Sequence, residues 1–289
     1  MTKVSIITIN RNNKEGLRKT MQSVLDQDFD DFEYIVVDGA SDDGSLDVIQ
    51  EFEPQFAQKG KAPFQYESKP DRGIFHAMNK GIVKANGEYL LFLNSGDYLA
   101  APTVLSDFSR IGATEDYVSG NIVVTIGGHN EIRKNPEKVD FLFLHHQAIH
   151  HQATFIKRTA FELYGMYNEG DKIMGDWEHS FRSIVMGGAS YKHIELTVSF
   201  YDITGISSSG LLKDRSQQEK KIVYLSIMPE YIVDALEYYK ELEKSFSDKM
   251  VLYNEYMNIK NGKMGFVVRI ILKLKEKKHK FALKTRKRG

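Results

Sequence analysis

Residues 89–99 read YLLFLNSGDYL, and this stretch sets the pattern for the whole fold. A continuous apolar run that ends in a turn is typical of a strand covered on both faces. The turn holds Asn94, Ser95, Gly96 and Asp97, which all favour turns. It is either a plain β-turn or a set of oxygen ligands on a rigid strand end, which would suit Mg²⁺ or Mn²⁺ bound to phosphates.

The same alternation of strand and helix runs through the residues before this stretch. Continuous apolar runs predict strands, and apolar residues three or four positions apart predict helices. The order β-α-β-α-β-α-β favours an α/β fold, with a mostly parallel sheet and helices on both of its faces. The predicted strands are 4–9, 34–38, 64–68 and 89–93, and the predicted helices are 13–25, 46–52 and 74–85.

Polar residues follow three of the predicted strands at their carboxyl ends. They are 8–10, Asp38 and 94–97. Ligands of open α/β sheets bind beyond the carboxyl ends of the strands, near a switch point in strand order. We therefore expect these clusters to meet in one crevice, with Asp97 at its mouth.

The rest of the chain is less regular. Residues 117–126, followed by Gly127-Gly128, predict a hairpin. Residues 211–260 predict amphipathic helix, with an inner stripe at Ile222, Leu225, Ile232, Leu236, Tyr239 and Leu242. We expect one domain over 1–210, in which 1–100 and 101–210 have separate roles, and a helical extension over 211–289.

Composition narrows the classes of protein that this chain can belong to. The 289 residues include no cysteine, which excludes disulfides and cysteine-based metal sites and fits a reducing cytosol. No stretch has the ~20 apolar residues that span a bilayer. The net charge of zero conceals a basic end, because 269–289 hold ten Lys or Arg against one acid, Glu276, and leave 1–268 at −9.

Residues 70–81, PDRGIFHAMNKG, place charged groups at both ends of a predicted helix. Arg72 precedes the helix and Lys80 lies near its end. Basic side chains and free N–H groups at a helix N-terminus suit phosphate. The alternative is ordinary ion pairing at the surface.

Two further motifs contain titratable side chains. Histidines 145, 146, 150 and 151 lack a neighbouring acid and the HExxH spacing, so we favour polar contacts or burial over a zinc site. GDWEHSFR (175–182) places Asp176 and Glu178 at the start of a predicted helix. A carboxylate there is either a helix cap or a general base.

Taken in order, these motifs resemble glycosyltransferase family 2. The likeness covers about 1–210 and is nearest to bacterial enzymes of surface-polysaccharide assembly. The stretches that carry it are VSIITINRNN, YIVVDGASDDGS, ESKPDRGIFHAMNKGI, ANGEYLLFLNSGDYL, HHQATFIKR and GDWEHSFR. The resemblance implies a GT-A fold, in which a Rossmann-like α/β unit binds a nucleotide sugar and is followed along the chain by an acceptor-binding part. It also implies a divalent cation, Mg²⁺ or Mn²⁺, and inversion at the anomeric carbon.

The resemblance also implies roles for single residues. Asp38 would contact uracil, Asp176 would be the catalytic base and Asp97 the metal ligand. Asn94 and Gly96 replace acids of the family's DxD region, so only Asp97 keeps a carboxylate there. The expected nucleotide-sugar contacts are Thr8, Asn10, Arg11, Asp38, Asp71, Arg72, Lys80, Asn94 and Ser95, and the expected acceptor contacts are His151 and Gln152.

The predicted activity is that of a hexosyl- or N-acetylhexosaminyl-transferase. The donor would be a UDP-sugar and the acceptor a saccharide or polyprenyl-linked sugar. A nucleotide-sugar-binding protein without activity stays an alternative because the NSGD turn has lost two acids. A nucleotidyltransferase is a further alternative, although TINRNNKEGL lacks the glycine-rich basic loop expected of one.

The basic end gives a prediction about location. Residues 265–289 combine an apolar patch with dense positive charge, which suits an anionic membrane surface. We expect a cytoplasmic protein that lies peripherally on the inner face of the membrane. A frayed helix and docking onto the acidic body are the alternatives, whereas nucleic acid is disfavoured because aromatic residues are sparse there.

Overall fold

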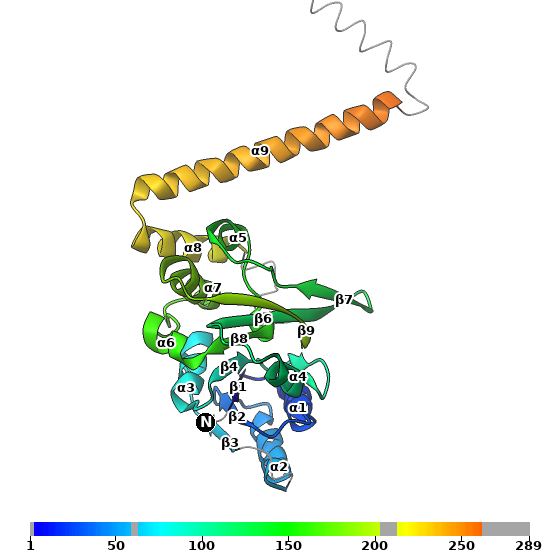
Figure 1. Ribbon diagram of the computed structural model, residues 1–289, viewed down its shortest axis with the longest axis vertical. Helices are drawn as coiled ribbons and strands as arrows, with labels where there is room; N and C mark the ends of the chain where they lie inside the picture. The colour runs from blue at the N-terminus through cyan, green and yellow to red at the C-terminus, as the bar shows by residue number, and fades with distance from the viewer. Residues whose placement is uncertain (1–2, 59–62, 203–212, 262–289) are drawn as a thin grey trace, which may run out of the picture. The chain divides into compact units, whose positions relative to one another are not determined.

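A nine-stranded sheet runs through the computed structural model, which describes residues 3–58, 63–202 and 213–261 (Figure 1). The chain divides into two units, Met1–Val223 and Tyr224–Gly289. The spatial order of the strands is β3-β2-β1-β4-β8-β6-β9-β5, and β7 pairs with β6. The strands are β1 (Val4–Asn10), β2 (Phe32–Asp38), β3 (Phe64–Ser68), β4 (Tyr89–Phe92), β5 (Tyr98–Leu99), β6 (Tyr117–Ile126), β7 (His129–Lys134), β8 (Thr154–Lys157) and β9 (Tyr191–Tyr201).

The first half of the sheet is parallel, as the sequence predicts. β3, β2, β1 and β4 lie side by side in that order and all run the same way. All seven residues of β1 are buried, because successive side chains enter opposite faces of the sheet. Ile6 packs in the core on one face and Ile7 in the core on the other. Burial on both faces favours a mostly apolar strand, and the side chains of its buried polar residues, Ser5, Thr8 and Asn10, are hydrogen-bonded.

The second half of the sheet is mixed. β8 is antiparallel to both β4 and β6, whereas β9 is parallel to β6. The α/β architecture is confirmed, but parallel pairing is confined to β3-β2-β1-β4 and to the β6-β9 pair. The predicted hairpin is confirmed as β6 and β7, which are joined at Gly127 and Gly128. Both glycines have positive φ angles, of 57° and 82°, which a tight hairpin turn requires.

Helices cover both faces of the sheet (Figure 1). Core residues of α1, α2 and α4 pack on one face, and those of α3 and α6 on the other. Within the described residues, no helix is both long enough and apolar enough to cross a membrane. The helices are α1 (Lys14–Leu25), α2 (Ser45–Gln58), α3 (Ile74–Lys84), α4 (Val104–Ile111), α5 (Phe141–His146), the 3₁₀ turn η1 (His151–Ala153), α6 (Arg158–Tyr164), α7 (Gly175–Ser180), the π-helical turn η2 (Phe181–Met186), α8 (Lys213–Ile227) and α9 (Glu230–Asn261).

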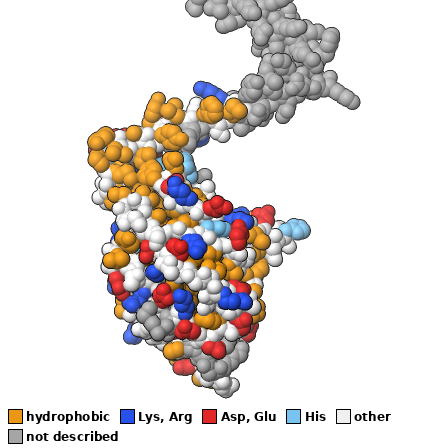
Figure 2. All heavy atoms as spheres, in the orientation of Figure 1, with side chains coloured by type: hydrophobic (Ala, Val, Ile, Leu, Met, Phe, Trp, Pro, Cys, Tyr) orange, Lys and Arg blue, Asp and Glu red, His pale blue; other side chains and the backbone are white. Residues whose placement is uncertain are grey.

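The helical C-terminal region is confirmed over α8 and α9, but its predicted inner stripe is wrong. The exposed large side chains include five of the six predicted residues, Ile222, Leu225, Ile232, Tyr239 and Leu242. The buried apolar residues are instead Val223, Tyr224 and Val233. Ile222-Val223 and Ile232-Val233 each place two apolar residues in succession, so periodicity alone could not select the buried face. Figure 2 shows hydrophobic side chains at the surface of this region.

Candidate functional site

The ends of β1 and β2 bring the first two predicted clusters into contact. Asn10 is paired in register with Asp38, and its Nδ2 donates a hydrogen bond to Asp38 Oδ1 at 2.8 Å. Asn10 Oδ1 is buried and accepts no hydrogen bond from the described residues. Thr8 is fully buried, and its hydroxyl donates to the carbonyl of Leu93. Thr8 therefore ties β1 to β4 beneath the site.

Asp38 accepts most of the side-chain hydrogen bonds that hold the ends of β1, β2 and β3 together. Its carboxylate accepts hydrogen bonds from Asn10, from the Ser68 hydroxyl at 2.7 Å, and from the hydroxyl and main-chain N–H of Ser41. Burial alone would raise the pKa of Asp38, but the bonds from Ser41, Ser68 and Asn10 outweigh burial and lower it. Asp38 is thus an ionised carboxylate that holds the loop after β2 in place, and its expected contact with uracil stays a prediction.

Arg11 and Asp71 lie beside these strand ends. Arg11 Nη1 is 4.0 Å from Asp71 Oδ1, and the Arg11 side chain is 67% exposed. A Cβ atom on Gly39 would come within 2.5 Å of Asp71 Oδ2. Glycine at position 39 therefore allows the loop after β2 to approach the loop before α3, and Arg11 extends its charge toward solvent beside them.

Arg72 and Lys80 make ion pairs. Arg72 pairs with Glu169, and Lys80 Nζ lies 3.4 Å from Glu67 Oε1. Lys80 also lines a hollow of about 670 Å³ between α3 and residues 166–169. The structure shows the ion-paired arrangement, and a phosphate contact of either residue stays a prediction.

The NSGD turn is fixed by side chains of α1 and of the residue before it. Asn13 Nδ2 donates to the Ser95 carbonyl at 2.9 Å. The Thr20 hydroxyl accepts from the Gly96 N–H at 3.0 Å and donates to the Asp97 carbonyl at 2.6 Å. The turn after β4 is thereby held against α1, so its side chains have fixed positions.

The second half of this turn packs against Asp202. Gly96 has a φ angle of +106°, and a Cβ atom there would come within 2.6 Å of Asp202 Oδ2. Asp97 is 4% exposed and accepts the Asp202 N–H at 2.9 Å. Burial raises the pKa of Asp97 to about 7, against the opposing effect of its hydrogen bonds and of His151. Asp97 is thus a buried acid whose negative charge is incompletely compensated.

Asp176 lies beside this turn, although 79 positions separate it from Asp97 in the sequence. Asp176 Oδ2 is 2.8 Å from His151 Nδ1, and His151 Nε2 is 3.4 Å from Asn94 Nδ2. Burial would lower the pKa of His151, but the hydrogen bond to Asp176 and the charges of Asp176 and Asp97 raise it overall. The fold therefore gathers the strand-end turn, the histidine and the carboxylate in one place.

The backbone around His151 is well anchored. The N–H of His150 donates to Asn135 Oδ1 at 2.9 Å, and its carbonyl accepts the Thr154 hydroxyl at 2.8 Å. Gln152 is 5% exposed, and its side chain hydrogen-bonds to Asp97. Within the described ranges, no group of three or more His, Asp or Glu side chains is placed to hold a metal ion.

Several residues of this site are absent from the sequence-based prediction. Ser41 and Ser68 hold Asp38, and Thr20 holds the turn. Glu219 of α8 accepts the N–H groups of residues 172–174, directly before α7. Ser41 closely follows the predicted strand 34–38 and Ser68 ends the predicted strand 64–68, so both had a local signal. Glu219 had none, because its contact spans more than 40 residues.

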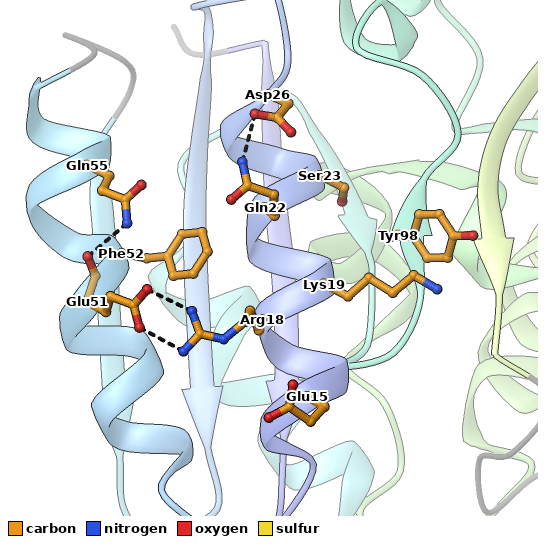
Figure 3. A pocket seen from close by; sticks show the side chains of 10 residues that line it. All are labelled: Glu15, Arg18, Lys19, Gln22, Ser23, Asp26, Glu51, Phe52, Gln55 and Tyr98. Atoms are coloured by element: carbon orange, nitrogen blue, oxygen red, sulfur yellow. Dashed lines mark hydrogen bonds and ion pairs between the residues drawn. The ribbon is translucent and has the colours of Figure 1, made fainter.

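A second hollow lies away from these residues. It has a volume of about 640 Å³ and is formed by α1, α2 and Tyr98 (Figure 3). Arg18 forms two hydrogen bonds of 2.7 Å with Glu51 across it, and Lys19 Nζ lies 3.8 Å from the centre of the Tyr98 ring. Arg18 and Glu51 therefore neutralise each other, and none of the predicted site residues lines this hollow.

Comparison with known proteins gives a family and relatives. Residues 5–175 match the family model described as glycosyl transferase family 2. A PGL/p-HBAD biosynthesis glycosyltransferase of Mycobacterium bovis is 29% identical over 209 residues, which cover 70% of this chain and 77% of the relative. The putative teichuronic acid biosynthesis glycosyltransferase TuaG of Bacillus subtilis is 35% identical over 94 residues, or 32% of this chain and 36% of the relative.

Solved structures share the fold. S. aureus TarS 1-349 in complex with UDP-GlcNAc superposes with a TM-score of 0.61 at 16% identity, covering 81% of this chain and 70% of that one. The mannosyltransferase PcManGT from Pyrobaculum calidifontis, in complex with GDP-Man and Mn²⁺, also has a TM-score of 0.61, at 17% identity. That match covers 94% of this chain and 79% of the other. Both likenesses confirm the expected fold.

Proposed function

The chain belongs to glycosyl transferase family 2, and from this premise we propose that it transfers a sugar from a nucleotide-diphosphate sugar to an acceptor hydroxyl with inversion. The donor is a UDP-sugar, and the acceptor is a saccharide or a polyprenyl-linked sugar of a cell-surface polysaccharide. The nucleotidyltransferase alternative is wrong, because the matching family and the named relatives are glycosyltransferases.

The observation that carries this proposal is the position of Asp176. Its side chain is 21% exposed, so a hydroxyl can reach it. Each carboxylate oxygen accepts one hydrogen bond, Oδ1 from the Trp177 N–H at 2.8 Å and Oδ2 from His151. A carboxylate oxygen can accept two hydrogen bonds, so each oxygen keeps a lone pair for a substrate proton.

The reaction is a single displacement. Asp176 takes the proton of the acceptor hydroxyl while that oxygen forms a bond to the anomeric carbon of the donor. The bond from this carbon to the diphosphate oxygen breaks, and its electron pair leaves with the nucleoside diphosphate. A positioned general base typically contributes ~10²–10⁴ in rate.

The donor would lie at the strand ends. Asn10 and Arg11 would face the nucleotide, with Asp71, Asn94 and Ser95 toward the diphosphate and sugar. This placement is supported by the hydrogen bonds that join the ends of β1, β2 and β4, and by the exposed charge of Arg11.

Asp97 is the proposed contact for a divalent cation, Mg²⁺ or Mn²⁺. The fit rests on its buried carboxyl, whose negative charge is only partly compensated by His151 and by hydrogen bonds. A magnesium ion commonly uses one or two carboxylates and takes its other ligands from water and substrate phosphates. When bound, the cation would neutralise charge on the departing diphosphate.

The test is a donor panel with purified protein. UDP- and GDP-sugars are screened by thermal shift with and without Mn²⁺, and nucleoside diphosphate release is then measured with candidate acceptors. Asp176→Asn should lower turnover by roughly 10²–10⁴ and leave donor affinity nearly unchanged. Loss of donor binding in this variant would contradict the assignment of Asp176.

The control is Asp30→Asn, in the exposed loop before β2 at the opposite end of the sheet, which should keep the wild-type rate. The same assay distinguishes a glycosyltransferase from a nucleotide-sugar-binding protein without activity. Such a protein would show a donor-dependent thermal shift but no release of nucleoside diphosphate with any acceptor.

A further inference from the structure

His151 lies between the turn after β4 and the proposed base. Its ring is 18% exposed, and its two nitrogens face different partners. Nδ1 is 2.8 Å from Asp176 Oδ2, and Nε2 is 3.4 Å from the amide nitrogen of Asn94. This ring is therefore the direct link between the two elements.

The partners determine which ring nitrogen carries the proton. An ionised carboxylate only accepts hydrogen bonds, so Nδ1 must donate to Asp176. In a neutral ring Nε2 is then an acceptor, and the Asn94 amide nitrogen is a donor. The result is a directional chain from Asn94 Nδ2–H to Nε2, and from Nδ1–H to Asp176. A carboxylate at position 94 would instead place an acceptor against an acceptor.

Both ends of this chain are fixed. Asn94 begins the turn that Asn13 and Thr20 tie to α1. His151 follows His150, whose N–H and carbonyl are held by Asn135 and Thr154. The ring thus sits on a rigid segment and meets a rigid partner, as a group that orients another side chain must.

We propose that His151 is a positioning residue for Asp176, and that Asn94 holds it in the Nδ1–H tautomer. Asn94 thereby helps to orient the base Asp176 through His151, in addition to its proposed contact with the donor. The hydrogen bond from Nδ1 fixes the rotamer of Asp176, so that a free lone pair faces the acceptor hydroxyl. This inference rests on the proposed function, because it assumes that Asp176 acts as the base.

The kinetic test uses amide replacements of the ring. In His151→Asn the side-chain amide can occupy the place of Nδ1–H, whereas His151→Ala has no donor. His151→Ala should lower kcat about 10²-fold, because a base displaced by ~1 Å can lose that factor, and should leave the donor Kd unchanged. His151→Asn should recover kcat to within about tenfold of wild type. Equal losses of kcat in the two variants would overturn the proposal.

The matched control is His193→Asn. His193 Nε2 also has an amide partner, Asn121 Oδ1 at 2.9 Å, but it lies on β9 and touches none of the proposed site residues. This variant should keep the wild-type kcat. If wild-type protein transfers no sugar from any donor, the proposed function fails before the variants are compared.

A second measurement needs neither activity nor a variant that folds well. Nitrogen NMR of the wild-type imidazoles, recorded at a pH above which the His151 signals no longer change, should show His151 as the Nδ1–H tautomer. The His151 signal is assigned by its absence from the spectrum of His151→Asn. If that variant is unstable, the signal is assigned from cross-peaks between the ring and protons of residues next to Asp176. An Nε2–H tautomer at His151 would refute the role of Asn94 and of the chain.

Discussion

At the scale of single residues, His179 is a buried histidine that stays neutral. Its ring is fully buried and stacks on Phe161, with centroids 4.4 Å apart. Nδ1 lies 2.7 Å from the Tyr117 hydroxyl, and Nε2 lies 3.0 Å from the Gly165 carbonyl. Burial and the nearby charge of Arg182 lower the pKa of His179 to about 3. The neutral ring of His179 therefore packs as part of the core between α7 and Phe161.

This pKa predicts how stability changes with pH. Above pH 6.5 the ring is neutral in both the folded and the unfolded chain. As the pH falls below 6.5, the unfolded chain takes up a proton that the folded chain refuses until about pH 3, so stability falls by up to about 1.4 kcal/mol per pH unit. His179→Gln should lower stability at pH 7.5 but flatten this loss. Urea midpoints between pH 7.5 and 4.5 measure it, and an unchanged slope would contradict the assignment.

His129→Asn is the control for that series, because His129 is exposed on β7. It should keep the wild-type dependence on pH.

The sequence predicted the place of a residue better than its partners. Asp38 was expected at a strand end, where it lies, but its bonds to Ser41 and Ser68 depend on how two loops fold over it. The acceptor contact expected of His151 stays a prediction, and its hydrogen bond to Asp176 had no signal in the sequence. Strand periodicity positions a Cα atom along an element, and only packing decides what its side chain meets.

At the scale of elements, α8 determines the start of α7. Glu219 is 8% exposed, and its carboxylate accepts the N–H groups of Ile173 and Met174, both at 3.0 Å. Met174 is the N-cap of α7, which carries Asp176, and Ile173 precedes it, so Glu219 holds the chain where this helix begins. Glu219→Gln replaces one acceptor oxygen with an amide donor, so either the N–H of Lys172 or those of Ile173 and Met174 lose their acceptor.

Glu219→Gln should lower the free energy of unfolding by about 1–3 kcal/mol. It should also lower kcat more than it changes the donor Kd, because α7 loses its fixed start. Urea denaturation and turnover assays measure these effects. Glu53→Gln, an exposed acid on α2, is the control, and equal behaviour of the two variants would refute a capping role for Glu219.

Elements of the first hundred residues were predictable because both faces of their sheet are covered. β1, β2 and β4 are buried at every position and mostly apolar, and such runs stand out in a sequence. β8 has only four residues and pairs antiparallel with β4 across a long connection. Such pairing leaves little local signal, which is why the mixed half of the sheet was not predicted.

At the scale of the whole molecule, charge is distributed unevenly along the chain. The basic stretch proposed to bind an anionic membrane, 265–289, lies outside the described residues, so membrane contact stays a prediction. Each lysine near an anionic surface adds about 1 kcal/mol, or about fivefold in affinity. Lys273, Lys275, Lys277 and Lys278 provide four adjacent charges for a test.

Changing these four lysines to Gln should release the protein from vesicles that contain anionic lipid. Co-sedimentation at low salt measures the bound fraction, with vesicles of neutral lipid as the baseline. A variant in which Lys14, Lys19, Lys69 and Lys84 are changed to Gln has the same net charge and should still sediment. Equal sedimentation of the two variants would refute a role for the tail.

The contact between Gly96 and Asp202 constrains how this lineage can change. Any side chain at position 96 would meet the Asp202 carboxylate at 2.6 Å, on a backbone with a φ angle of +106°. An acid at position 96 is therefore disfavoured twice, by the nearby carboxylate and by the backbone conformation. A change at position 202 would remove the first obstacle and leave the second, so this position of the turn stays closed to side chains unless the backbone itself is rebuilt.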